Sequence, residues 1–214
     1  MLKKTANERE VTCLSYREFT WSKAKQDFSL KTIEGKHFFP EVPVIEPSYL
    51  LQETLKRGIP WAIAVGNEKA RSEAIINPIL LEVQQVLEGK VSVFSGEEFN
   101  VEPEVGLNGT CDFLLSQSPE QIAVEAPVLV VVEAKKDDLK RGMGQCLAEM
   151  VAAQRFNHMY QQEISSVYGC VSTGTAWRFL KLENSTVTVD LTDYPVPPVD
   201  RVLSFLVWIA RGSC

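Results

Sequence analysis

The feature that most constrains this chain is the apolar run VLVVV at 128–132, which passes directly into Glu133-Ala134-Lys135. β-Branched residues favour strands, and a strand without polar residues on either face is typically buried on both sides. We therefore expect a mixed central sheet flanked by helices, with an acid and a lysine at the end of its most buried strand.

The rest of the pattern predicts an α+β arrangement around that strand. Apolar residues recur at helical spacing over 68–87, where Pro78 predicts a kink, and again over 142–157. The pair Asn108-Gly109 predicts a turn. Further strands are expected at 91–94 (with 98–102 as its continuation), 113–115, 167–172, 177–182 and 187–191, and a last helix at 199–210.

The length of 214 residues favours one domain over 1–214. We divide it into an N-terminal helical extension at 1–66, a core at 67–191 and a C-terminal helix at 192–214. The extension is expected to hold a short helix at 15–28 and a proline-rich connector. A second helix would be capped by Ser48 and would end near Arg57, because Gly58 and Pro60 follow.

Composition excludes several classes of site. The five cysteines are scattered without a CxxC pair, which argues against zinc or a disulfide framework, and two distant histidines argue against a histidine-built site. The apolar runs are too short to span a bilayer and no signal segment is evident, so we expect a cytoplasmic protein that does not associate with a membrane. A net charge of −6 counts against a dedicated nucleic-acid binder.

The acid-x-lysine pattern needs context, because it occurs four times in this chain. Glu34-Gly35-Lys36 and Glu88-Gly89-Lys90 contain glycine in turn-like surroundings, and Asp138-Leu139-Lys140 lies in a charged segment. Only Glu133-Ala134-Lys135 ends a buried strand. Alternation along a strand places Glu133 and Lys135 on one face.

A second carboxylate is expected beside Glu133. If residue 117 pairs with residue 128 in a hairpin, Asp112 lies opposite Glu133, with Cβ atoms roughly 5 Å apart. Two carboxylates at such a separation repel by about 4 kcal/mol at an effective dielectric constant near 20. Lys135 and a divalent cation, Mg²⁺ or Mn²⁺, would compensate that repulsion. Glu73 and Gln145 are further candidates from the neighbouring helices.

With these residues the chain resembles the PD-(D/E)xK nuclease superfamily, which has the restriction endonuclease-like fold and an αβββαβ core. It is most similar to the nuclease domain of type I restriction motor subunits and to stand-alone bacterial relatives. The resemblance covers roughly 68–183 and rests on Glu73, Asp112, Glu133-Ala134-Lys135 and Gln145. Cys111 stands where the family name has proline, and no helicase motor is present.

The resemblance implies a role for each of these residues. Asp112, Glu133, the carbonyl of Ala134 and Glu73 would bind Mg²⁺. Lys135 would orient or deprotonate the attacking water, and Gln145 would position Lys135 or a phosphate. The implied activity is endonucleolytic hydrolysis of phosphodiester bonds, in DNA. Stand-alone relatives often pair, so a homodimer is also expected.

Simpler interpretations compete with this one. An acid-x-lysine pattern alone is more often a solvated strand end, Asp112 can cap a turn, and Glu73 can stabilise its helix through the dipole. Lys135, Lys136, Lys140 and Arg141, with Arg155 further on, are either a solvated loop or a local basic face. The alternative functions are a catalytically inert nuclease-fold module that binds a protein or nucleic acid, and a hydrolase of smaller phosphate esters.

Overall fold

The computed structural model describes residues 14–212, and within this range eight strands form one mixed sheet. Its order is β1-β7-β6-β5-β4-β3-β2, and the short β8 pairs with β6. The pairs β4–β5 and β1–β7 are parallel, and the other pairs are antiparallel. The strands are β1 (Lys31–Glu34), β2 (Ser92–Glu98), β3 (Thr110–Ser116), β4 (Val128–Ala134), β5 (Ser166–Ser172), β6 (Ala176–Glu183), β7 (Thr186–Val189) and β8 (Tyr194–Pro195). The predicted α+β class with a mixed sheet is confirmed.

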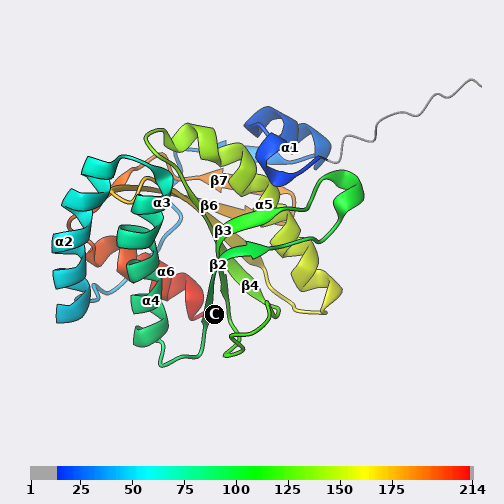
Figure 1. Cartoon of the computed structure of the whole chain (residues 1–214). Helices are drawn as coiled ribbons and strands as arrows, with labels where there is room; N and C mark the ends of the chain where they lie inside the picture. Colours follow the sequence, from blue (N-terminus) through cyan, green and yellow to red (C-terminus); the bar gives the residue numbers. More distant parts are fainter. Residues whose placement is uncertain (1–13, 213–214) are drawn as a thin grey trace, which may run out of the picture.

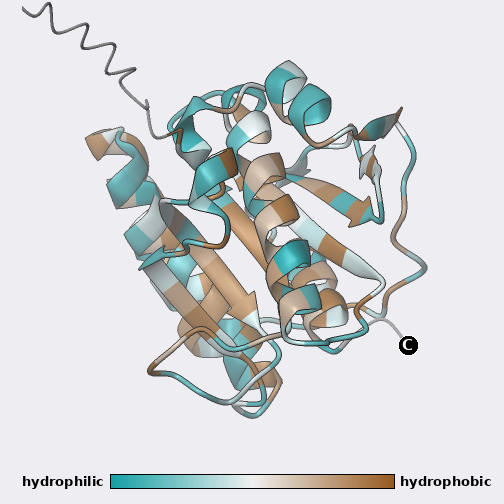
Figure 2. Cartoon of the chain, turned by 90° about the vertical axis from the view of Figure 1, so that its right-hand side faces the viewer, coloured by the Kyte–Doolittle hydropathy of each residue, from teal (hydrophilic) through white to brown (hydrophobic). Residues whose placement is uncertain are grey.

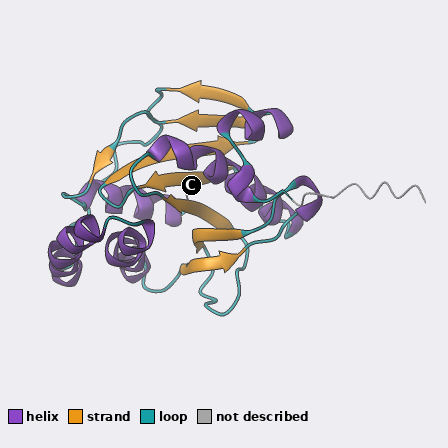
Figure 3. Cartoon of the chain, turned by 45° about the horizontal axis from the view of Figure 1, so that its top comes forward, coloured by secondary structure: helices purple, strands orange, loops and turns teal. Residues whose placement is uncertain are grey.

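Helices cover both faces of this sheet (Figures 1 and 3). One face carries α2 (Tyr49–Val65), α4 (Asn77–Val86) and α6 (Asp200–Ala210), and the other carries α5 (Leu139–Met159) with α1 (Trp21–Asp27) outside it. Each interface is a separate apolar core, and Figure 2 shows apolar residues concentrated on the strands and on the helix segments against them. No helix within residues 14–212 is long and apolar enough to span a membrane.

Strand β4 lies between β3 and β5, and all seven of its residues are buried. This confirms the interpretation of the apolar run at 128–132. Helix α5 connects β4 to the parallel β5 and packs on both strands. The helix can approach closely at Gly142, where a Cβ would lie 2.7 Å from Cγ1 of Val171 on β5.

The hairpin of β3 and β4 has the predicted register at the site but not at its closed end. Phe113 pairs with Val132, so continuing this register by one residue places Asp112 opposite Glu133. At the other end Ser116, not residue 117, pairs with Val128, and an irregularity between Leu115 and Ser116 accommodates the difference. A β-bulge of this kind adds one residue to one strand and cannot be located from alternation alone.

The N-terminal extension contains more than the predicted helices. A short 3-10 helix, η1 (Tyr16–Glu18), and α1 occupy the range expected for one helix. Residues 31–34 form β1, which pairs in parallel with β7 at the edge of the sheet. The extension is therefore part of the sheet, a feature that four mostly exposed residues gave no reason to predict.

Helix α2 is longer than predicted. Ser48 caps it as expected, since its Oγ accepts a hydrogen bond from the Leu51 amide at 3.2 Å. The predicted end near Arg57 is wrong, because the helix continues through Gly58 and Pro60 to Val65. Pro60 removes one backbone donor, but buried side chains on both sides of it, Leu55 and Ala62, keep the helix on the core.

We expect Gly58→Ala to destabilise the fold, although alanine favours helices by about 1 kcal/mol over glycine. A Cβ at position 58 would lie 2.5 Å from the carbonyl oxygen of Ala74, which belongs to the next helical segment packed against α2. Overpacking of this kind costs about 1–3 kcal/mol, so the steric term exceeds the propensity gain. Urea denaturation of the two proteins measures the difference, and equal or greater stability of the variant would contradict this packing.

The helical segment predicted at 68–87 is present in three consecutive parts. These are α3 (Glu68–Arg71), a π-helical turn η2 (Ser72–Ile76) and α4, with Pro78 in the first turn of α4. The predicted irregularity thus lies in the turn just before Pro78. A π turn changes the direction in which the side chains before it point relative to those after it, and Glu68 lies before this turn.

Candidate active site

The candidate site lies where β4 ends and β3 begins. Asp112 accepts a hydrogen bond from the Ala134 amide at 2.8 Å, which fixes its carboxylate beside the end of β4. Leu114 and Val131 belong to the core under α5. Because side chains alternate along a strand, Asp112 and Glu133 lie on that same face.

Glu133 is a buried carboxylate, with an exposed fraction of 1%. Its Oε1 atom forms an ion pair with Nζ of Lys135, as the strand alternation predicted. Its Oε2 atom is buried and has no hydrogen-bond partner among the described residues. A buried carboxylate oxygen without a donor is costly, so this atom marks a place where a proton or a positive group is needed.

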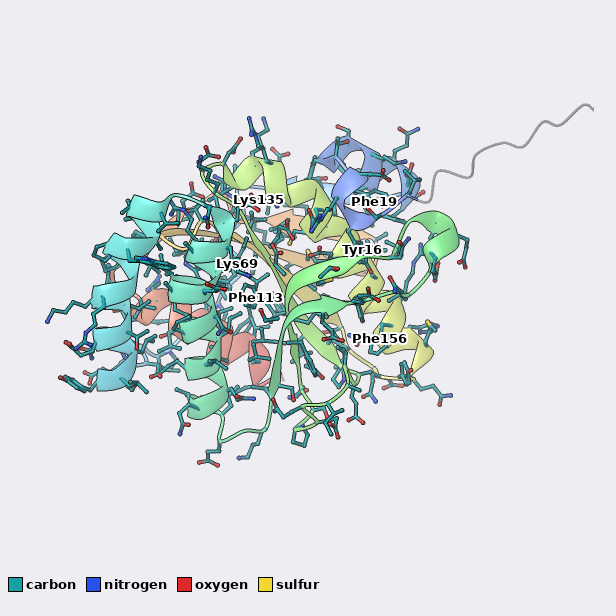
Figure 4. The ribbon with its side chains drawn as sticks, in the orientation of Figure 1. Tyr16, Phe19, Lys69, Phe113, Lys135 and Phe156 are labelled. Carbon is teal, nitrogen blue, oxygen red and sulfur yellow. The ribbon has the colours of Figure 1, made fainter. Side chains whose placement is uncertain are left out.

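Lys135 is held in place by the residues around it. Its amide donates to the Ser172 carbonyl at 2.8 Å, which continues the parallel pairing of β4 and β5. Its aliphatic chain lies against Gly142 of α5, where a Cβ would be 3.0 Å from Lys135 Cγ. The glycine therefore leaves room for the lysine to reach Glu133. Figure 4 shows Lys135 near the start of α5 in the upper half of the view, with Phe19 and Tyr16 to its right.

Helix α5 contributes two polar side chains below this pair. Gln145 is largely buried, and its Nε2 donates to Oε1 of Glu149 at 3.0 Å. Glu149 is fully buried, and its Oε2 has no partner among the described residues. The roles inferred for Gln145 toward Lys135 or a phosphate stay predictions. Glu149 was not predicted, although a carboxylate four residues after Gln145 on an apolar helix face was a signal.

The acids strongly influence one another. Burial, and then the charge of Asp112, raises the pKa of Glu133 to about 8. Burial, and then the charge of Glu133, raises the pKa of Glu149 well above its usual range. Burial also raises the pKa of Asp112, against the opposing effects of the Ala134 amide and Lys135. Charged carboxylates here therefore need a positive partner beyond Lys135.

A second glutamate of the long helix, which was not predicted, acts on the site through its charge. The Glu73 side chain is 58% exposed and lies 3.5 Å from Lys69 Nζ. The glutamate of this segment whose charge acts on Asp112, Glu133 and Lys135 is Glu68, in the first turn of α3. Because the π turn after α3 interrupts the 3.6-residue spacing, the sequence pattern does not tell which glutamate of this segment acts on the site. The proposed role of Glu73 as a metal ligand stays a prediction.

The residues present suit a hard divalent cation. The partnerless Oε2 of Glu133 and the carboxylate of Asp112 provide oxygen ligands, which Mg²⁺ and Mn²⁺ prefer. Across residues 14–212, no group of three or more His, Cys, Asp and Glu side chains is arranged to hold a metal ion. A cation here would thus be held by two carboxylates, with a backbone carbonyl and waters completing its coordination.

No protein-family model matches the chain, and no curated protein sequence matches it.

Proposed function

We propose that this protein is a metal-dependent nuclease with a restriction endonuclease-like core. The observation that carries the proposal is the pair of adjacent carboxylates, the partly buried Asp112 and the buried Glu133, whose partnerless oxygen lies beside Lys135. The order α4, β2, β3, β4, α5, β5 supports it, because it matches the αβββαβ order of that core. An inert scaffold would have no reason to keep two like charges at this depth.

Mg²⁺ would be held by Asp112, Glu133 and the carbonyl of Ala134, and it would supply Lewis-acid activation of water and of the phosphate. Lys135 would hold the attacking water in line with the phosphorus and stabilise the charge that develops on the phosphate. Gln145 and Glu149 would support this arrangement from α5, since their hydrogen bond orients both side chains. DNA is the proposed substrate.

The substrate is identified by incubating the protein with supercoiled plasmid, linear duplex, single-stranded DNA and RNA. Each is tested with Mg²⁺, with Mn²⁺ and with EDTA. We expect cleavage of DNA with either ion and none with EDTA, and cutting of closed plasmid would show endonuclease activity. If the folded protein cleaves only small phosphate esters, it is a different hydrolase. If it cleaves nothing, the inert binding module becomes the better account.

A further inference from the structure

We propose that Arg17 binds a backbone phosphate of the nucleic acid at this site, as a cation supplied by the N-terminal segment. This inference rests on the proposed function, because it names a further substrate-binding residue for it. Arg17 lies in η1, outside the sheet and outside the range of the family resemblance. The inference stands on how the segment Leu14–Trp21, here called the N-terminal clamp, is seated beside the site.

The N-terminal clamp packs tightly against the elements that form the site. A Cβ at Gly106 would lie 2.8 Å from Leu14 Cβ, and one at Gly109 would lie 3.3 Å from Tyr16 Cδ2. On α5, a Cβ at Gly144 would lie 2.3 Å from the carbonyl oxygen of Phe19. Glycines at these three positions let the clamp contact both the loop before β3 and the first turns of α5.

Hydrogen bonds hold the N-terminal clamp in this position. The Tyr16 amide donates to the Asn108 carbonyl at 3.0 Å, and the Tyr16 hydroxyl donates to the Phe99 carbonyl at 2.6 Å. Asn108 Nδ2 donates to the Leu14 carbonyl at 2.8 Å. Tyr16 and Phe19 are both buried, so the exposed Arg17 is held between two anchored residues.

The Arg17 side chain is available to bind an anion. No acidic side chain among residues 14–212 lies within ion-pair distance of it, and the neighbouring Glu18 carboxylate accepts a hydrogen bond from the Ser15 amide. Lys135, by contrast, is engaged with Glu133.

The chemistry of the ligand follows from these charges. An acidic centre in a chain of net charge −6 repels phosphate, so a substrate needs a free cation nearby. A guanidinium presents parallel donors that match two phosphate oxygens, which an ammonium group cannot do in the same geometry. Arg17 is therefore suited to a backbone phosphate next to the one that the proposed function assigns to Lys135.

The test measures binding separately from cleavage. Wild type, Arg17→Ala, Arg17→Lys and Lys31→Ala are titrated with fluorescent 20-base-pair DNA in Ca²⁺ at several salt concentrations, and with single-stranded RNA of equal length. Lys31 is the matched control, because it is exposed and lies on β1 at the opposite edge of the sheet from β2 and β3. Thermal unfolding confirms that every variant is folded.

We expect Arg17→Ala to raise the dissociation constant about tenfold and to reduce the salt slope by roughly 0.9, the value for one lost phosphate contact. Arg17→Lys should recover part of the affinity, and Lys31→Ala should match wild type. Equal effects of Arg17→Ala and Lys31→Ala, or no binding by wild type to either probe, would overturn the inference. Cleavage by wild type, read in Mg²⁺, reports on the proposed function independently of these results.

Discussion

Replacing Lys135 with methionine should lower the rate of DNA cleavage by about 10³-fold, the loss typical of removing one preorganised charge from an active site. Methionine keeps most of the aliphatic chain that packs against Gly142, so the variant tests the ammonium group and not the packing. The loss is expected because Lys135 is the one basic side chain paired with Glu133 at the end of β4 within residues 14–212. Single-turnover cleavage at saturating enzyme measures it.

The matched control is Lys136→Met, which removes the same charge one residue further along. Lys136 is exposed and lies in the bend that follows the end of β4. Its variant should keep cleavage within a few-fold of wild type, with the difference confined to binding. If the two variants lose activity equally, Lys135 acts as part of a general basic surface and the proposed catalytic role is wrong.

The second large effect is on stability without a divalent cation. The pKa of Glu133 rises from 4.5 to about 8 on folding, so between these values the folded state binds a proton that the unfolded state has released. Stability contributed by this group is therefore fully present below pH 4.5, is lost as pH rises toward 8, and is constant above that. The full shift corresponds to an upper bound of about 5 kcal/mol.

Glu133→Gln should reduce this pH dependence and make the metal-free protein more stable than wild type at pH 8. Urea denaturation in EDTA at pH 5, 6, 7 and 8 measures the free energy of unfolding of both proteins. Glu149→Gln should act in the same direction, because burial raises the pKa of Glu149 as well. Parallel pH profiles for wild type and Glu133→Gln would show that Glu133 is not the group responsible.

Much of the fold could be predicted because its central elements have strong local patterns. The run at 128–132 is apolar on every residue, which identified β4 as a buried strand. The register that places Asp112 near Glu133 followed from pairing one hairpin, and near the site it agrees with the observed pairs. Both inferences use periodicities that hold over short distances in sequence.

The features that were missed depend on contacts between distant segments. Helix α2 passes through Gly58 and Pro60 because Leu51, Leu55 and Ala62 are buried on both sides of them, and β1 is fixed by its pairing with β7. The charge of Glu68, in α3, acts on Glu133. The charge of Glu133 in turn acts on Glu149, which is buried on α5. Apart from the four-residue spacing of Gln145 and Glu149, these relations are not visible in a local spacing of residue types.

The most direct test of the account is binding of Mn²⁺ at Asp112 and Glu133, measured by calorimetry on wild type, Asp112→Asn and Asp137→Asn. Asp137 is an exposed acid close by in sequence that serves as the control. The account predicts binding by wild type and Asp137→Asn and its loss in a folded Asp112→Asn protein. Equal binding by all three proteins, or no binding by wild type, would contradict a metal centre at these carboxylates.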